Sequence, residues 1–181
     1  RGIVFFSAHY GNWELGPIII KSLGLDPLCV YRKSNNKFVE LLIQNIRGKN
    51  ATYAPKGDIG AKKSYLWLRK GKSLALLMDQ KLNEGLSIDF LGKPSNTASF
   101  IADIAIRMNL DIVPIKFSRD TNNHNIITFY NKINMPKNNL SKNKKISFIL
   151  KQVNDVMSQW IKDQPENWLW IHRRWQKDLY V

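Results

Sequence analysis

The residues with the clearest chemical potential stand near the start of the chain, where a histidine and a carboxylate lie five positions apart. His9 follows an apolar run at residues 2–8, and Glu14 lies just beyond the pair Gly11 and Asn12. On one straight helix, positions five apart are roughly 140° out of register, so these side chains converge only if the backbone bends between them. Glycine and asparagine permit such a bend. If they converge, a histidine and a carboxylate at such a place can form a general base and its orienting residue, although Glu14 could also be no more than a favourable first-turn carboxylate.

The elements around this pair follow from the same stretch. The apolar run predicts a strand, and the residues after Glu14 predict a helix. Pro17 fits the first turn of a helix and is costly further in, so the helix should begin between Asn12 and Gly16. His9 would then stand at the carboxyl end of a strand, which is where ligands bind in an open α/β sheet.

Strand and helix patterns alternate along the rest of the chain. Strands are predicted at 27–32, 52–54, 73–78, 111–117 and 126–130, a short extended piece at 87–91, and helices at 36–47, 58–70, 98–108 and 146–162. Residues 92–97 have the composition of a turn, and Pro114 suggests an irregularity or an edge in its strand. The alternation, without repeat or linker, predicts an α/β fold: a single domain over residues 1–181 with a mainly parallel, mixed central sheet flanked by helices.

Further polar residues fall at the ends of predicted strands. Arg32 closes the second strand, and Asp79 and Gln80 follow the long apolar run at 73–78. If these strands are parallel neighbours, the side chains open on the same sheet edge as His9. The guanidinium of Arg32 matches the geometry of an oxyanion, although an ordinary exposed cation at a strand end is the plain alternative. Asp79 could equally cap a turn.

Composition restricts the partners. The chain has 28 Lys and Arg residues against 14 Asp and Glu residues, a net charge of +14, which predicts an anionic partner: nucleic acid, acidic lipid, a phosphorylated small molecule or an acidic protein. The single Cys29 excludes an internal disulfide and fits a reducing compartment. No apolar run reaches the roughly 18 residues of a membrane span. The three histidines are scattered, without paired ligand spacing, so no metal is expected.

Five stretches resemble, in order, the motifs of one family. They are His9 to Glu14, Val30 to Arg32 with Asn35, Asp79 with Gln80, Asp89 to Thr97, and Trp168 to Trp175. Together they resemble the late, secondary acyltransferases of bacterial lipid A assembly, within the glycerolipid acyltransferase superfamily whose first motif is His-x4-Asp/Glu. Two departures are small: Leu91 stands where the family usually has a second Phe, and Met78 where a smaller residue is common.

The resemblance implies a glycerolipid-acyltransferase-like fold, a mechanism and a set of site residues. The donor would be a fatty acyl thioester on acyl carrier protein, the acceptor a hydroxyl of a phosphorylated lipid A precursor, and no cofactor would be needed. His9 would take the proton from that hydroxyl as it attacks the thioester carbonyl, and Glu14 would hold the imidazole. Asp79 would assist the acceptor or pair with Arg32. The implied substrate-binding residues are Asn12, Arg32, Asp79, Gln80, Arg173 and Arg174.

The resemblance also implies a location and leaves alternatives open. The chain would work at the cytoplasmic face of the bacterial inner membrane, held on the anionic surface by its charge or by a membrane-anchoring N-terminal segment that we expect to be missing. The alternatives are a related acyltransferase with a lysophospholipid or glycosylated inositol lipid as acceptor, an inactive scaffold-like member, and a basic nucleic-acid-binding module. Intact His9 and Glu14 argue against the scaffold. The sequence shows no zinc-ligand spacing, RNP-type motif or helix-turn-helix, so we do not expect nucleic acid as a partner.

Overall fold

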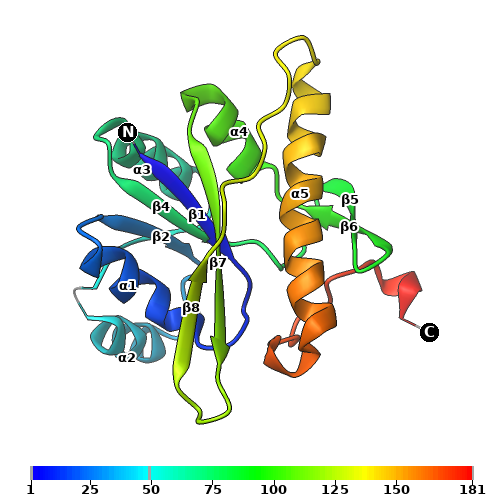
Figure 1. Cartoon of the computed structure of the whole chain (residues 1–181). Helices are drawn as coiled ribbons and strands as arrows, with labels where there is room; N and C mark the ends of the chain where they lie inside the picture. Colours follow the sequence, from blue (N-terminus) through cyan, green and yellow to red (C-terminus); the bar gives the residue numbers. More distant parts are fainter. Residues whose placement is uncertain (1, 49, 181) are drawn as a thin grey trace.

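A six-stranded sheet forms the centre of the molecule, in the order β3-β2-β4-β1-β7-β8 (Figure 1). The computed structural model describes residues 2–48 and 50–180. The strands are β1 (Ile3–Ser7), β2 (Pro27–Tyr31), β3 (Thr52–Pro55), β4 (Ser73–Leu77), β7 (Asp111–Arg119) and β8 (Asn125–Phe129). Every pairing in this sheet is parallel except that of β7 with β8. The prediction of an α/β fold with a mainly parallel, mixed sheet is confirmed.

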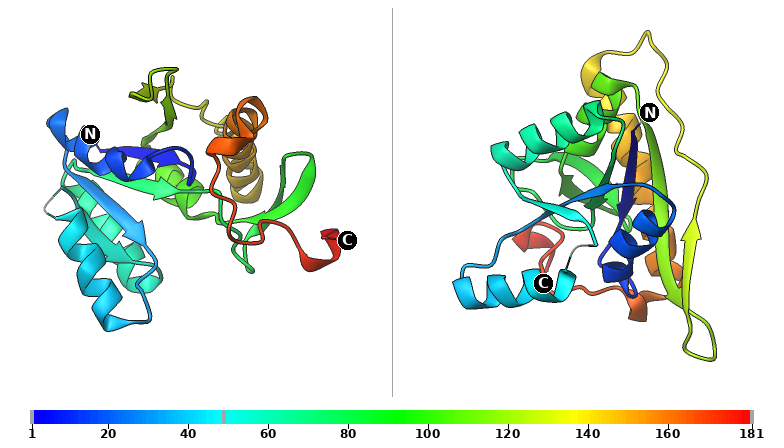
Figure 2. Two further views of the ribbon diagram at one scale, coloured as in Figure 1. Left: turned by 90° about the horizontal axis from the view of Figure 1, so that it is seen from below. Right: turned by 90° about the vertical axis from the view of Figure 1, so that its left-hand side faces the viewer.

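The helices lie on both sides of this sheet (Figures 1 and 2). They are α1 (Gly16–Ser22), α2 (Lys37–Arg47), α3 (Asp58–Arg69), α4 (Phe100–Met108) and α5 (Lys142–Asp163), with 3-10 turns η1 (Trp13–Leu15), η2 (Pro165–Asn167) and η3 (Lys177–Leu179). Pro17 occupies the first turn of α1, as its fixed φ favours. Asn36 caps α2 because its side-chain oxygen accepts from the N–H groups of Phe38 and Val39. Across residues 2–48 and 50–180, none of the helices has the length and apolarity that a bilayer crossing requires.

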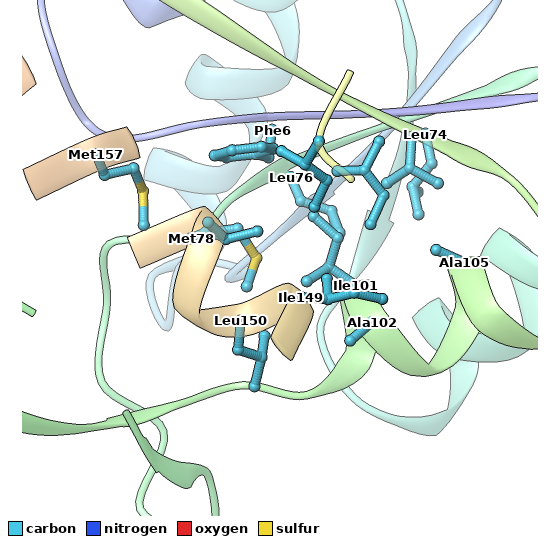
Figure 3. Packing of buried hydrophobic residues seen from close by; sticks show 14 of the residues in the cluster. Phe6, Leu74, Leu76, Met78, Ile101, Ala102, Ala105, Ile149, Leu150 and Met157 are labelled. Carbon is cyan, nitrogen blue, oxygen red and sulfur yellow. The ribbon is translucent and has the colours of Figure 1, made fainter. Parts of the chain in front are cut away.

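The alternation of side chains along the strands divides the core between the two faces of the sheet. Val4 and Phe6 of β1 join the larger cluster, which α3, α4 and α5 cover and of which Figure 3 shows a part around Phe6 and Leu76. Phe5 belongs instead to a smaller cluster beside α1. Leu74 and Leu76 of β4 belong to the same cluster as Val4 and Phe6, on the same face of the sheet. The short helix α1 thus covers the thinner side, and this side contains the cavity described below.

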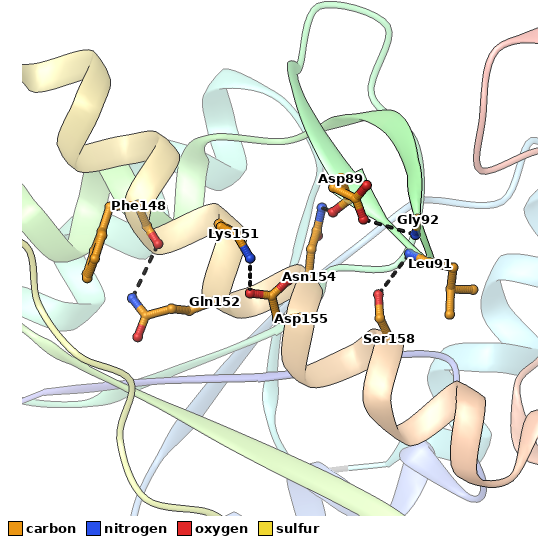
Figure 4. A network of polar contacts seen from close by, with 9 residues as sticks. All are labelled: Asp89, Leu91, Gly92, Phe148, Lys151, Gln152, Asn154, Asp155 and Ser158. Carbon is orange, nitrogen blue, oxygen red and sulfur yellow. Dashed lines mark hydrogen bonds and ion pairs between the residues drawn. The ribbon is translucent and has the colours of Figure 1, made fainter.

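A β-hairpin beside α5 replaces the turn predicted at residues 92–97. Strands β5 (Leu86–Phe90) and β6 (Lys93–Thr97) pair antiparallel, and Leu91 and Gly92 both take positive φ values, 55° and 81°, at the tip. The polar composition of β6 favours a turn, but tertiary packing holds this segment as a strand. Strand propensity depends strongly on such packing, so composition alone gave the wrong prediction. Ser158 of α5 accepts a hydrogen bond from the Leu91 N–H at 3.0 Å, and Asn154 donates to the Asp89 carbonyl at 2.9 Å (Figure 4).

Pro114 lies in an interior strand, contrary to the prediction of an edge. Strand β7 pairs with β1 on one side and β8 on the other. The Pro114 carbonyl accepts a hydrogen bond from the N–H of Tyr130, which follows β8. In a strand, the N–H and the carbonyl of one residue point to the same side, so the position where Pro114 lacks an N–H faces β8. The pairing of β7 with β8 ends at Ile115, and no hydrogen bond between β7 and β1 is lost.

Candidate active site

Strand register brings His9 and Asp79 together at the carboxyl edge of the sheet. Ser7 at the end of β1 is the register partner of Leu77 at the end of β4. His9 and Asp79 each follow two residues later, and the imidazole Nδ1 lies 2.8 Å from the carboxylate Oδ1. Neighbouring parallel strands that end level thus place a histidine beside a carboxylate 70 positions away in sequence.

Asp79 is a buried carboxylate held by two side-chain donors. Its side chain is 3% exposed, and the indole N–H of Trp168 donates to Oδ2 at 2.9 Å. Burial by itself would raise the pKa of Asp79, but the hydrogen bonds from His9 and Trp168 and the attraction of the imidazole outweigh it, so the pKa is lowered. The carboxylate is therefore ionised at neutral pH and able to stabilise an imidazolium.

His9 is oriented for proton transfer. Its side chain is 21% exposed and lines the cavity, and its ring lies edge-on to Trp13 at a centroid distance of 5.1 Å. Because Nδ1 is engaged by Asp79, Nε2 is the ring nitrogen left for a substrate. An ionised carboxylate on Nδ1 favours the tautomer with a bare Nε2, which is the form that a general base requires.

Glu14 has a different partner from the one expected. The 3-10 turn η1 carries its carboxylate toward α2, where Arg47 donates from Nη2 to Oε1 at 2.7 Å and from Nε to Oε2 at 3.1 Å. This bidentate bond raises the pKa of Arg47. The expected contact between His9 and Glu14 is therefore corrected: Asp79 fills that position, and Glu14 fastens η1 to α2.

A cavity of about 280 Å³ opens beside His9 on the α1 side of the sheet. Most of its apolar lining comes from within the strands and from α1, and most of its polar lining comes from residues at or after the strand ends. Helix α2 contributes Ile43 and Arg47, and η1 contributes Trp13. The apolar group includes Phe5, Ile20, Cys29, Ala75, Leu77, Ile115 and Phe117, and the polar group includes His9, Glu14, Arg32, Lys56 and Gln80. Such a space suits a ligand with a long apolar part and a polar reacting end.

Two cations and an amide stand at the polar end of this cavity. Arg32 follows β2 and Lys56 follows β3, and both are exposed. Although Lys56 reaches solvent, partial desolvation of its ammonium group, together with the nearby positive charge of Arg32, lowers its pKa, while Asp79 opposes the shift. Lys56 Nζ donates to Gln80 Oε1 at 3.3 Å. Sequence reasoning missed Lys56, although the strand-end rule that selected Arg32 applies to it equally.

Arg174 of the closing tryptophan-arginine motif joins the C-terminal segment to the β5–β6 hairpin. Arg174 is 1% exposed, and its guanidinium donates to Ser95 Oγ, the Asn96 carbonyl and Thr97 Oγ1 of β6. Burial lowers the pKa of Arg174 to about 10. This placement corrects its expected contact with substrate, since the charged group is used to fasten the tail to the hairpin.

Arg173 and Asn12, two further residues that the resemblance assigned to substrate binding, lie outside the cavity lining. Arg173 is exposed, with its guanidinium 5.9 Å from the Tyr180 ring centre. Asn12 precedes η1 and makes no side-chain capping bond there. Trp168, which the sequence marked only as the start of the closing motif, is a direct donor to Asp79, and no local pattern signals a contact over 89 positions.

Cys29 lies in the cavity wall and is unsuited to covalent chemistry. Burial raises the pKa of its thiol to about 12, and the positive charge of Arg47 only partly opposes the shift. The thiolate, which is the nucleophilic form, is therefore scarce at neutral pH. Cys29 is therefore not a candidate for the nucleophile of this site.

An α/β sheet with an oriented His-Asp pair beside an apolar cavity forms a candidate site for general-base chemistry on an apolar ligand. A model of the family described as bacterial lipid A biosynthesis acyltransferase matches residues 1–177. The chain belongs to this acyltransferase family, which confirms the resemblance found in the five motifs. A comparison with curated proteins gave no significant match.

Proposed function

We propose that this protein transfers a fatty acyl chain from acyl carrier protein to a hydroxyl of a lipid A precursor, with His9 as the general base. The observation that carries the proposal is the His9–Asp79 pair at the polar end of an apolar cavity, in a member of the lipid A acyltransferase family. Asp79 holds the tautomer that Glu14 was expected to hold.

The reaction follows from the free ring nitrogen. His9 Nε2 takes the proton from the acceptor hydroxyl as its oxygen attacks the thioester carbonyl. The carbon–oxygen bond forms, the carbon–sulfur bond breaks, and the imidazolium returns the proton to the departing sulfur, which leaves as a thiol. Asp79 stabilises the imidazolium in between, and positioned general-base help of this kind is worth roughly 10²–10⁴ in rate.

The lining of the cavity suits the two substrates. The apolar strand residues would hold the acyl chain, and each buried CH₂ contributes about 0.8 kcal/mol. Arg32 and Lys56 would bind an acceptor phosphate, with Gln80 keeping Lys56 in place. Glu14 acts indirectly by holding Arg47 in the wall of the cavity.

The charge of the chain supports its partners and location. Acyl carrier protein is acidic, the acceptor is phosphorylated, and the cytoplasmic leaflet of the inner membrane is anionic. With a net charge of +14, the chain is suited to all three, since each Lys or Arg near an anionic leaflet contributes about 1 kcal/mol. We place the protein at the cytoplasmic face of that membrane.

The direct test compares His9→Ala with His172→Ala in a transfer assay. Purified protein is given a labelled acyl thioester of acyl carrier protein and a lipid A precursor, with a lysophospholipid as a competing acceptor. We expect His9→Ala to lose roughly 10²–10⁴ in rate. The control His172→Ala, at an exposed position outside the cavity lining, should keep wild-type turnover.

Two results would contradict the proposal. Near-normal transfer by His9→Ala would remove the general base. Preferential acylation of the lysophospholipid would leave the chemistry in place and assign a different acceptor.

A further inference from the structure

Helix α2 carries its apolar side chains on the outside of the molecule. Phe38, Leu42 and Ile46 recur at helical spacing and are 83%, 59% and 74% exposed, and Val39 and Leu41 beside them are 43% and 58% exposed. A surface helix normally turns such a stripe toward the core. Figure 2 shows α2, in cyan, at the margin of the molecule, in agreement with the exposure of these side chains within residues 2–48 and 50–180.

The polar side of α2 faces the protein instead and fixes this orientation. Glu40 is 4% exposed and accepts hydrogen bonds from the Tyr31 hydroxyl, the Ser34 N–H and Gln44 Nε2. About two turns later, Arg47 forms its bidentate bond with Glu14. Turning the apolar stripe inward would break all of these bonds, so the outward stripe is built into the fold.

The charged residues near the stripe indicate an anionic partner. Arg32, Lys33 and Lys37 are exposed on the segment that leads into α2 and on its first residue. The nearby carboxylates of Glu14 and Glu40 are already engaged with the protein. A group of exposed cations at the start of an exposed apolar stripe fits a surface with anionic headgroups above hydrocarbon. A second copy would bring the same cations together, which disfavours self-association through this face.

The inner side of the same helix borders the candidate site. Ile43 and Arg47 line the cavity beside His9, on the side of α2 opposite to the stripe. A bilayer that received the stripe would therefore be separated from the cavity at this point only by α2. The use of this cavity by a lipid substrate rests on the proposed function.

We propose that the outer face of α2, formed by Phe38, Val39, Leu41, Leu42 and Ile46, docks into the headgroup region of an anionic bilayer and sets the cavity at the lipid surface. Binding then combines two contributions. The cations draw the chain to the anionic surface, and the apolar stripe supplies the burial that salt does not screen.

The test measures flotation of the full chain with vesicles of phosphatidylglycerol and phosphatidylethanolamine. The double variant Phe38→Ser and Ile46→Ser should bind at least ~10-fold more weakly than wild type, since two large apolar side chains are lost from the stripe. The control Phe148→Ser removes a phenylalanine that is 42% exposed on α5 and should bind as wild type. Circular dichroism and unfolding curves check that all variants remain folded.

Two results would overturn the docking face. One is vesicle binding by the double variant equal to that of wild type. The other is a dimer in lipid-free light scattering that the double variant converts to monomer, which would assign the stripe to a second copy.

Acyl transfer separates this proposal from the proposed function. The double variant should lose transfer on vesicle-embedded acceptor and keep it on detergent-dispersed acceptor, whereas His9→Ala should lose both and still bind vesicles. If wild type binds vesicles through α2 but transfers no acyl chain in either format, the proposed function fails and the docking face stands.

Discussion

Replacing Asp79 with Asn tests the assignment of the imidazole partner with little change in shape. In the wild type, Oδ1 faces His9 Nδ1 at 2.8 Å and Oδ2 accepts from the Trp168 indole at 2.9 Å. An amide offers one oxygen and one NH₂ group in place of two acceptors. The indole N–H can only donate, so it keeps the oxygen, and the NH₂ group is left facing Nδ1.

The tautomer then decides the size of the effect. Facing an NH₂ group, Nδ1 of His9 has to accept, so the proton moves to Nε2 and the nitrogen that faces the substrate is no longer a base. The same exchange in a serine-protease triad lowers kcat by about 10⁴ while the geometry survives. We expect Asp79→Asn to lower kcat by about 10³–10⁴ with little change in KM, because the amide touches the base and not the substrate.

The assay measures kcat and KM for acyl transfer, with Glu14→Gln as the matched control. Glu14→Gln removes a half-exposed ion pair with Arg47, an interaction of roughly 0.2–1 kcal/mol, and should keep kcat within about tenfold. Full activity of Asp79→Asn together with a severe loss in Glu14→Gln would refute the reasoning and return the orienting role to Glu14.

Three further predictions concern the cations, the pH dependence and the closing motif. The double variant Arg32→Ala and Lys56→Ala should raise KM for a phosphorylated acceptor roughly 10–100-fold, as expected for lost charge-assisted hydrogen bonds, and should leave KM for a dephosphorylated acceptor unchanged. Because the pKa of Asp79 is lowered in the fold, its ionised form stabilises the protein above about pH 4, and this contribution is lost as the pH falls through the folded-state value. Asp79→Asn should therefore flatten the acid side of the curve of unfolding free energy against pH, and an unchanged acid slope in denaturant titrations would contradict this. Arg174→Met should lower the free energy of unfolding by about 1–3 kcal/mol by leaving buried acceptors unpaired, whereas Arg173→Met should change it by less than about 0.5 kcal/mol.

The sheet and the edge that holds the site were predictable because they depend on patterns within short windows. The apolar run of β4 ending at Asp79, and the strand before His9, placed both residues at carboxyl ends of strands. The strand β6 was not predictable in this way, since Lys93, Pro94 and Asn96 favour turns, and α5 and Arg174 supply the contacts that hold it.

The pairing within the site could not be read from sequence because it depends on strand order. Nothing local indicates that β4 lies beside β1, so the carboxylate five positions from His9 was a closer candidate than Asp79. The inverted orientation of α2 was hidden for the same reason: its periodicity shows an apolar stripe, but only the bonds of Glu40 and Arg47 decide which way the stripe faces.

The mass of lipid A in cells shows most directly whether this protein acylates a lipid A precursor and whether it uses His9 to do so. The gene that encodes this chain is deleted from its own bacterium, and wild-type or His9→Ala copies are returned. Deletion should remove one acyl chain from lipid A, the wild-type copy should restore it, and the His9→Ala copy should not. An unchanged lipid A mass after deletion would contradict the proposed acceptor, and full restoration by His9→Ala would contradict the general base.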